Sequence, residues 1–337
     1  MSGLPTGYEA RAWDLEDVSA VATLMNAYAL RVSGREQTTA ESLAAQMKTP
    51  GLDLSSDARL VVGPGRDVVA VGFVVDLSDP HVQVQSLGMV RREDQGRGIG
   101  SWIADWIEQR ARRAIDQAPE HARVTVMQAV DDRDESARRL LDAHGYRVVR
   151  HFWRMVVELG DQGPAAEWPA GIRVTGFDPE ADLRPAFIAG RDAFSDHWGH
   201  VDTSQEAAFE RFRHRVISDP DRDPDLWFLA RDEDDIGGVC YASPREGTDP
   251  TSGYIQTLGV RRPWRRRGVA LALLLHAFEA LRGRGRQRCA LHVDSESLTG
   301  ATRVYEKAGM RVAELNHAYE KELRSGIDLA KRHVASA

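Results

Sequence analysis

Apolar residues follow two different periods along this chain, and the two periods alternate. Short apolar runs of strand length are followed by stretches in which apolar residues recur every three or four positions, as in a helix. In the first half, strands are expected at 8–13, 59–62, 68–77, 81–87, 123–130 and 146–159, with helices after Asp14 and at 136–144. In the second half, strands are expected at 173–177, 226–230, 236–242, 254–258, 289–293 and 310–323, with helices from Asp178 and at 299–308. This order predicts an α/β (α+β layered) fold built on mixed sheets.

The same layout begins twice, which indicates an internal repeat that covers nearly the whole chain. Between the two copies, residues 161–169 break every periodicity and combine glycine, proline and polar residues. We therefore expect a first domain at 1–159, a linker at 160–171, a second domain at 172–323 and a terminal tail at 324–337. A chain of 337 residues is too long for one ordinary core and suits two domains.

A basic turn that contains glycine joins an expected strand to an expected helix at 260–270. The first backbone N–H groups of a helix have no partner within the helix, and the helix dipole makes that end mildly positive. Gly268 and Ala270 carry little or no side chain, so a phosphate can approach these N–H groups closely. The neighbouring Arg265, Arg266 and Arg267 add positive charge. The segment is therefore predicted to bind an anion.

A second copy of this turn occurs in the first half of the chain. It begins at Val90 and continues through Gln95, Gly96, Arg97, Gly98, Ile99 and Gly100, and apolar residues at helix spacing follow it again. Two copies in the same strand-to-helix context are stronger evidence for an anion-binding turn than one short motif. The glycine spacing does not fit the dinucleotide-binding fingerprint, and no Gly-Lys-Ser/Thr follows as in a P-loop.

The segment Arg265-x-x-Gly268-x-Ala270 resembles the acyl-CoA pyrophosphate loop of the GNAT N-acetyltransferases, Q/R-x-x-G-x-G/A. This resemblance implies two tandem GNAT-like domains, each a mixed, mostly antiparallel sheet flanked by helices. It also implies acetyl-CoA as the donor substrate, no metal, and a backbone N–H near Leu258 to Val260 that meets the developing oxyanion. Among tandem members, the layout resembles the mycothiol synthases, in which the C-terminal copy is the active one. The donor-binding residues that the two loops imply are Leu258, Val260, Arg265, Arg266, Arg267, Gly268, Val269 and Ala270, together with Val90, Gln95, Gly96, Arg97, Gly98, Ile99 and Gly100.

A second motif, at 300–310, resembles the A-x-x-x-Y-x-x-x-G-F/M segment near the end of GNAT domains. The resemblance implies that Tyr305 lies beside the CoA sulfur, where a phenol with a pKa of about 10 can protonate the leaving thiolate. The alternative is a half-buried aromatic residue on a short helix. Family members often carry an asparagine seven residues earlier to contact CoA, and Leu298 here leaves that contact in doubt.

The first repeat departs from the pattern at one position, because Leu141 stands where the second repeat has Tyr305. A leucine has no proton to donate, so the second domain is expected to be the catalytic one. Three roles are then open to the first domain: it binds acyl-CoA without turnover, it completes the acceptor cleft, or it has a structural role.

The acceptor amine is mostly protonated at neutral pH and must lose a proton before it attacks. His292 and Asp294, at the end of an expected strand, are candidate bases, and so is Glu296, acting through water, although polar residues are also ordinary at strand ends. Asp196, His197 and Trp198 follow the first helix of the second domain, in a region that lines the acceptor pocket in GNAT folds. These three residues either hold a cationic amine or form a helix-capping loop.

Composition limits the possible localisation, metal sites and partners of the protein. An apolar content of 42%, with neither a signal-peptide pattern nor an apolar run of membrane length, predicts a cytoplasmic protein with no membrane partner. Two cysteines, Cys240 and Cys289, allow no disulfide framework and no cysteine-rich metal site. The net charge of −7 argues against a nucleic-acid partner for the arginines of 261–267. We expect a monomer or a homodimer.

These observations predict an N-acetyltransferase. An acetyl group moves from acetyl-CoA to the amine of a small molecule by direct attack on the thioester, with Tyr305 as general acid. The alternative from another class of function is a non-catalytic acyl-CoA-binding sensor or regulatory protein.

Overall fold

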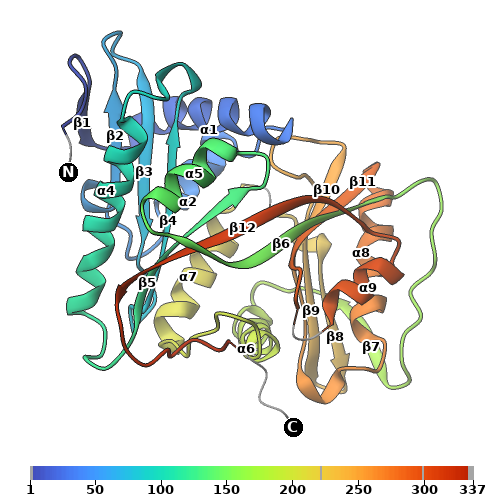
Figure 1. Cartoon of the computed structure of the whole chain (residues 1–337). Coiled ribbons are helices and arrows are strands. Elements are labelled where there is room, and N and C mark those ends of the chain that lie inside the picture. Colours follow the sequence, from blue (N-terminus) through green and yellow to red (C-terminus); the bar gives the residue numbers. More distant parts are fainter. Residues whose placement is uncertain (1–2, 221, 298–299, 333–337) are drawn as a thin grey trace. The chain divides into compact units, whose positions relative to one another are not determined.

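Two compact units make up the chain, and neither unit is one continuous stretch of sequence. The computed structural model describes residues 3–220, 222–297 and 300–332 (Figure 1). Unit 1 consists of Met1–His151, Thr203–Ser218 and Asn316–Leu329, and unit 2 consists of Phe152–Asp202, Asp219–Leu315 and Ala330–Ala337. The units therefore share most of their residues with the expected domains 1–159 and 172–323, but they exchange segments.

Unit 1 is a mixed sheet flanked by helices, with strands in the order β1-β2-β3-β4-β5-β12. The strands are β1 (Glu9–Ala12), β2 (Ala58–Val62), β3 (Val68–Val75), β4 (Gln83–Val90), β5 (Val124–Asp131) and, from Asn316 onward, β12 (Arg311–Arg324). The helices are α1 (Val18–Ser33), α2 (Ala40–Met47), α3 (Leu54–Asp57), α4 (Ile99–Ala111), α5 (Glu135–Ala143) and α7 (Gln205–Ser218). Among the described strands of this unit, β4 and β5 are parallel neighbours, and the other neighbouring pairs are antiparallel.

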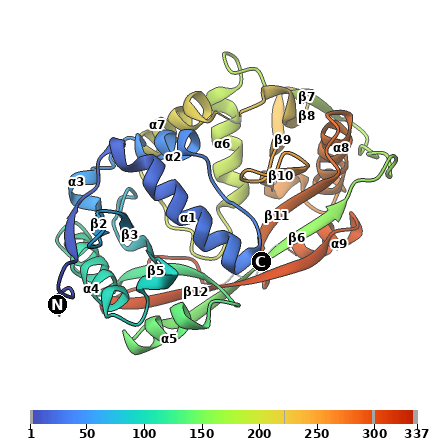
Figure 2. The ribbon, with the colours of Figure 1, turned by 90° about the horizontal axis from the view of Figure 1, so that it is seen from above.

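Glycines in the sheet of unit 1 let α4, the helix after the first anion loop, pack closely. A Cβ atom at Gly72 would lie 3.0 Å from the ring of Trp106, and one at Gly88 would lie 3.1 Å from Ile103. Because side chains alternate along a strand, the neighbouring Val71 faces the opposite side of the sheet. That side packs on α1 and α2 through a buried cluster that includes Trp13, Val21, Leu24, Leu43 and Leu60 (Figure 2).

Unit 2 has the same architecture, with strands in the order β6-β11-β10-β9-β8-β7. The strands are, from Phe152 onward, β6 (Arg147–Glu158), then β7 (Ile172–Gly176), β8 (Trp227–Asp232), β9 (Asp235–Ser243), β10 (Ser252–Val260) and β11 (Arg288–Asp294). The helices are α6 (Leu183–Phe194), α8 (Val269–Gly283) and α9 (Ala301–Lys307). The parallel pair is β10 and β11, and α8 packs on the sheet at Gly238, where a Cβ atom would lie 3.0 Å from Leu273.

The last strand of each sequence repeat completes the sheet of the other unit. Residues 152–158 of β6 pair antiparallel with β11, with Phe152 opposite Asp294 and Glu158 opposite Arg288. Residues 316–324 of β12 pair antiparallel with β5. Helix α7, from the second half of the sequence, likewise belongs to unit 1, where Nε2 of His214 lies 3.1 Å from the carbonyl of Ala45 in α2.

The predicted α/β class, with mixed, mostly antiparallel sheets and flanking helices, is confirmed. Helices α2, α3 and α7 were not predicted from the sequence, and the helix expected from Asp178 begins at Leu183. Leu298 and residues 333–337 of the expected tail lie outside the described residues. In the part of the chain that the structure describes, every helix is too short or too polar to cross a membrane.

The exchange of strands predicts that the two halves stay together after the linker is cut. A site for a specific protease inserted between Pro164 and Ala165, which are both exposed, would separate β6 from β7 in sequence after folding. We expect the cleaved halves to elute as one species in native size-exclusion chromatography and to separate in denaturant. Two separately eluting, folded halves would contradict the exchanged pairing, and the uncleaved insertion variant is the control.

Candidate acyl-donor sites

The two predicted anion loops have the same backbone conformation. Each begins with a 3₁₀ turn, at Arg92–Asp94 and at Arg262–Trp264, and ends at a left-handed glycine before its helix. These glycines are Gly98, with φ of 85°, and Gly268, with φ of 91°. Neither α4 nor α8 has a side-chain N-cap, and a Cβ atom at either glycine would meet nothing within 4 Å. The first N–H groups of both helices are therefore accessible to a ligand.

A second left-handed residue precedes each of these glycines. It is Gly96 in the first loop, with φ of 74°, and Arg266 in the second, with φ of 61°. A left-handed backbone costs a non-glycine residue about 1 kcal/mol, so the second loop keeps this shape in spite of its sequence. Strain of this kind is often retained where a backbone shape serves a function.

Below each loop, the two parallel strands pair briefly and then separate. Strand β10 pairs with β11 only at Ser252–Tyr254, opposite Arg288–Ala290. Strand β4 pairs with β5 only at Gln83–Ser86, opposite Thr125–Gln128. Beyond these residues the facing N–H and C=O groups of the strands no longer bond to each other, which leaves them for a ligand or for water.

In unit 1 the space between the separated strands is a pocket of about 270 Å³. It extends from the loop glycines Gly96 and Gly98 to Leu141 of α5, and Tyr28 and Asp134 line it as well. The pKa of Asp134 is lowered, because hydrogen bonds from Ser136 and Tyr28 outweigh the effect of its burial. The pocket therefore joins the predicted anion loop at one end to an apolar wall and an ionised carboxylate at the other.

Unit 2 differs from unit 1 at the strand that leads into its loop. The register between β9 and β10 shifts between Ile255 and Thr257, which places a β-bulge at Gln256. In unit 1, β3 and β4 pair without a shift from Val75 opposite Gln85 to Ala70 opposite Val90. A bulge turns the following backbone groups to new directions and is common beside active sites. Leu258 and Val260 lie just beyond it.

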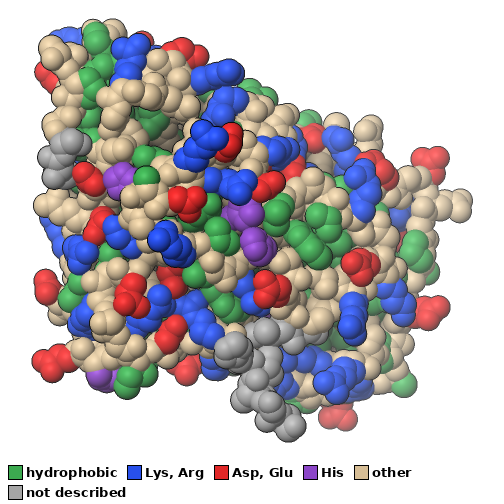
Figure 3. Space-filling view, in the orientation of Figure 1, with side chains coloured by type: hydrophobic (Ala, Val, Ile, Leu, Met, Phe, Trp, Pro, Cys, Tyr) green, Lys and Arg blue, Asp and Glu red, His purple; other side chains and the backbone are tan. Residues whose placement is uncertain are grey.

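Four of the five arginines in the second loop are paired with carboxylates. Arg262 and Arg265 both contact Asp196, while Arg261 binds Asp192 at 2.6 Å and Arg267 lies 3.4 Å from Asp232. Acidic and basic side chains are also interspersed over the face of the molecule in Figure 3. Arginines that are already paired with carboxylates have less positive charge to offer to the phosphates of a polyanion, so this pairing disfavours a nucleic-acid interface.

Arg265 fastens the second loop to unit 2 rather than pointing away from it. Its guanidinium donates to the carbonyls of Val260, at 2.9 Å, and Ala193, at 3.0 Å, and to Asp196 at 2.7 Å. At the same place in the first loop, the amide of Gln95 donates to the carbonyl of Val90 at 3.3 Å. Each of these side chains therefore holds its loop onto the preceding strand.

The expected acceptor residues Asp196, His197 and Trp198 face different partners. The pKa of Asp196 is held well below its usual range by Arg262 and Arg265, so its charge serves the loop. Burial lowers the pKa of His197, whose ring lies 4.4 Å from that of Phe194. The guanidinium of Arg332 lies 4.8 Å from the ring of Trp198. A shared amine-binding role for these three residues remains a prediction.

Tyr305 lies on α9 and is 7% exposed. Burial raises its pKa well above the usual range, with smaller contributions from Cys240 and Tyr254, so the phenol is protonated at neutral pH. Leu141 is its counterpart in α5, because the helix ends match: Met310 N–H donates to the carbonyl of Tyr305 at 3.0 Å, as Tyr146 N–H does to that of Leu141.

Two of the candidate bases, His292 and Asp294, lie on β11, and Glu296 follows this strand. Nδ1 of His292 is 2.9 Å from the hydroxyl of Tyr254, a residue that was not predicted from the sequence to belong to the site. Asp294 ends the strand and accepts a hydrogen bond from the N–H of Glu296 at 3.0 Å. Among the described residues, no group of three or more histidine, cysteine or acidic side chains is arranged to bind a metal ion.

The ion pairs of Asp196 predict an effect of pH on the stability of unit 2. Its native pKa is lowered, so its carboxylate stabilises the fold fully above about pH 5, where the unfolded group is ionised, and this stabilisation is lost as the pH falls below about 4. Asp196→Asn should lower the urea midpoint at neutral pH, and the difference from the wild type should shrink in acid. Asp225→Asn, at a side chain that is 87% exposed, is the matched control. A difference that does not change with pH would contradict this role.

Comparisons with known proteins agree with this geometry. A family model described as the acetyltransferase (GNAT) family matches residues 190–310. The crystal structure of a GCN5-related N-acetyltransferase from Sphaerobacter thermophilus is 36% identical, with a TM-score of 0.77, and the match covers 97% of this chain and 99% of that one. A tandem GNAT protein from the clavulanic acid biosynthesis pathway shares the fold at 15% identity, with a TM-score of 0.71 over 95% of this chain and 100% of that one.

Curated relatives match a smaller part of the chain. A mycothiol acetyltransferase from Thermobispora bispora is 32% identical over 177 residues, which are 52% of this chain and 58% of that protein. One from Paenarthrobacter aurescens is 27% identical over 184 residues, 52% of this chain and 54% of that protein. The chain thus spans little more than half the length of these relatives.

Proposed function

Because the chain belongs to the GCN5-related N-acetyltransferase (GNAT) family, we propose that unit 2 transfers an acetyl group from acetyl-CoA to the amine of a small molecule. The observation that carries this proposal is the combination found in unit 2. An uncapped helix start, a bulged strand that separates from its parallel neighbour, and a buried protonated tyrosine belong to one compact unit. Unit 1 also has an uncapped helix start and a strand that separates from its parallel neighbour, but this strand has no bulge. Leu141 stands in place of the tyrosine.

Each part of unit 2 has a distinct task in the proposed reaction. The N–H groups from Arg266 to Ala270 bind the donor's pyrophosphate, and Arg265 keeps their loop in place. The amine nitrogen attacks the thioester carbon and forms the C–N bond, while a backbone N–H near Leu258 to Val260 stabilises the oxyanion. When the C–S bond breaks, Tyr305 gives its proton to the thiolate.

The acceptor is proposed to be a small primary amine. The curated relatives are named mycothiol acetyltransferases, so an amine related to mycothiol is the first acceptor to test. Unit 1 is proposed to bind acyl-CoA through Val90 and Gln95–Gly100 without transferring the acyl group. This division of tasks also defines the alternative, a protein in which both units only bind acyl-CoA and neither turns it over.

Removal of the Tyr305 hydroxyl tests the catalytic assignment. Tyr305→Phe should lower kcat by about 100-fold, because the thiolate loses its proton donor, and should leave acetyl-CoA affinity within about twofold. Thiol release with an amine acceptor measures kcat, and calorimetry measures the affinity. Tyr146→Phe, which removes a buried phenol from unit 1, is the matched control. Undiminished turnover in Tyr305→Phe would remove this residue from the mechanism and favour the alternative of a binding protein.

A further inference from the structure

A tyrosine and a histidine on neighbouring strands form a hydrogen-bonded pair that has no role in the steps proposed above. The hydroxyl of Tyr254 lies 2.9 Å from Nδ1 of His292. Burial raises the pKa of Tyr254 to about 12, so the phenol keeps its proton at neutral pH and donates it to Nδ1. A histidine that accepts at Nδ1 is neutral and carries its own proton on Nε2.

This pair lies where β10 and β11 separate. Tyr254, opposite Ala290, is the last residue of β10 that pairs with β11, and His292 is two residues further along β11. The bulge at Gln256 and the loop follow Tyr254 along the same strand. An electrostatic interaction with Tyr254 also contributes to the raised pKa of Tyr305, the proposed acid. The pair therefore lies at the end of the proposed donor site.

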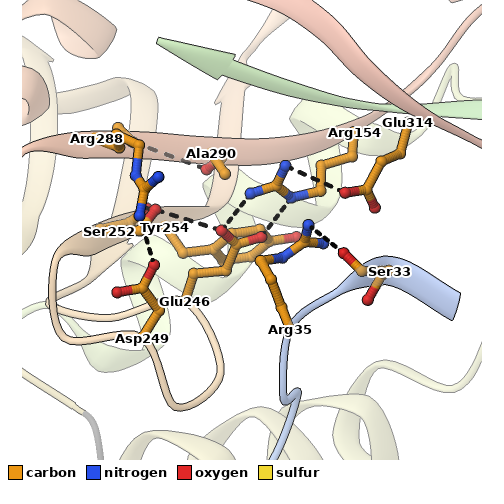
Figure 4. A network of polar contacts seen from close by, with 12 residues as sticks. Ser33, Arg35, Arg154, Glu246, Asp249, Ser252, Tyr254, Arg288, Ala290 and Glu314 are labelled. Carbon is orange, nitrogen blue, oxygen red and sulfur yellow. Dashed lines mark hydrogen bonds and ion pairs between the residues drawn. The ribbon is translucent and has the colours of Figure 1, made fainter. Parts of the chain in front are cut away.

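A network of charged groups lies beside Tyr254. Arg154 of β6 binds Glu246 through two hydrogen bonds, of 2.6 and 2.5 Å, and lies 3.5 Å from Glu314. The hydroxyl of Ser252 lies 3.3 Å from Glu246, and the ring of Tyr254 lies beside this network (Figure 4). Burial is the main cause of the raised pKa of Tyr254. Glu246 and Cys289 raise it further, while His292 and Arg154 oppose them.

We propose that Tyr254 and His292 form a proton relay that deprotonates the acceptor amine; this inference rests on the proposed function. One ammonium proton passes to the oxygen of Tyr254 while the proton of Tyr254 passes to Nδ1 of His292. The free amine then forms the C–N bond, the C–S bond breaks, and the thiolate takes the proton of Tyr305. The new amide nitrogen loses its extra proton, which restores Tyr305.

The relay returns to its starting state through solvent. His292 has an exposed side chain, so the imidazolium can release a proton to water. The overall change is an ammonium and a thioester converted to an amide, a thiol and one proton, with no other reactant. A relay of this kind is needed only for an acceptor that arrives as an ammonium ion, which defines the substrate class as basic primary amines.

Two nucleophiles of different basicity test the relay. Just below neutral pH, glucosamine is mainly an ammonium ion, whereas hydroxylamine is mainly neutral. Tyr254→Phe and His292→Gln should lower kcat/KM for acetyl transfer to glucosamine by about 100-fold and for hydroxylamine by less than about threefold. His200→Gln, which alters the ion pair of a partly buried histidine with the exposed Asp202 in the same unit, is the control. Acetyl-CoA titration confirms that each variant binds the donor.

The outcomes separate the relay from the function on which it rests. Equal losses with both nucleophiles would make the pair a structural contact and overturn the relay, and so would full activity of both variants with glucosamine. A wild type that transfers acetyl to neither nucleophile would overturn the proposed function and the relay together. Only a loss confined to the protonated acceptor supports proton removal by Tyr254 and His292.

Discussion

The short pairing of β10 with β11 is the constraint on which the proposed site depends. Backbone N–H and C=O groups must be paired or hydrated, so strands that separate after three residue pairs leave a row of groups that need partners. An extended donor can supply those partners, and the helix start above them can hold its phosphates. The bulge at Gln256 redirects the backbone at the level where the thioester is proposed to lie, and Tyr254 marks the point of separation.

Both units have a short pairing of parallel strands below the loop, but the side chains around it differ. Both have the left-handed loop and the separated parallel strands, and the pocket of unit 1 has Leu141 at the position that Tyr305 occupies in unit 2. Unit 2 adds the bulge, Tyr305 and the pair of Tyr254 with His292. The loop and the separated strands occur twice, but the proposed reactive side chains occur in one unit. This arrangement fits an enzyme in which one copy catalyses and the other binds the acyl donor. The exchanged strands β6 and β12 make each unit depend on both halves of the sequence.

Local sequence patterns explain why the strands and the loops could be predicted. Alternating periods located the strands, and the spacing from Arg265 to Ala270 located the loop. Partner choice was not predictable: β6 has the same apolar pattern whether it pairs with β5 or β11, so the sequence could not reveal the exchange. The contacts of Asp196 with Arg262 and Arg265 join residues far apart in sequence, as does that of Tyr254 with His292. A search for aromatic hydroxyls on the strand before the loop would have found Tyr254.

Calorimetric titration of acetyl-CoA into the wild type, Gly98→Glu and Gly268→Glu tests the central claim most directly. A carboxylate at either helix start repels the pyrophosphate, and the matching alanine variants separate this charge from strain at a left-handed residue. We predict that Gly268→Glu abolishes binding to unit 2 and, with it, acetyl transfer, while Gly98→Glu removes only a separate, non-catalytic site. Unchanged donor affinity and turnover in Gly268→Glu would show that the second loop does not hold the donor.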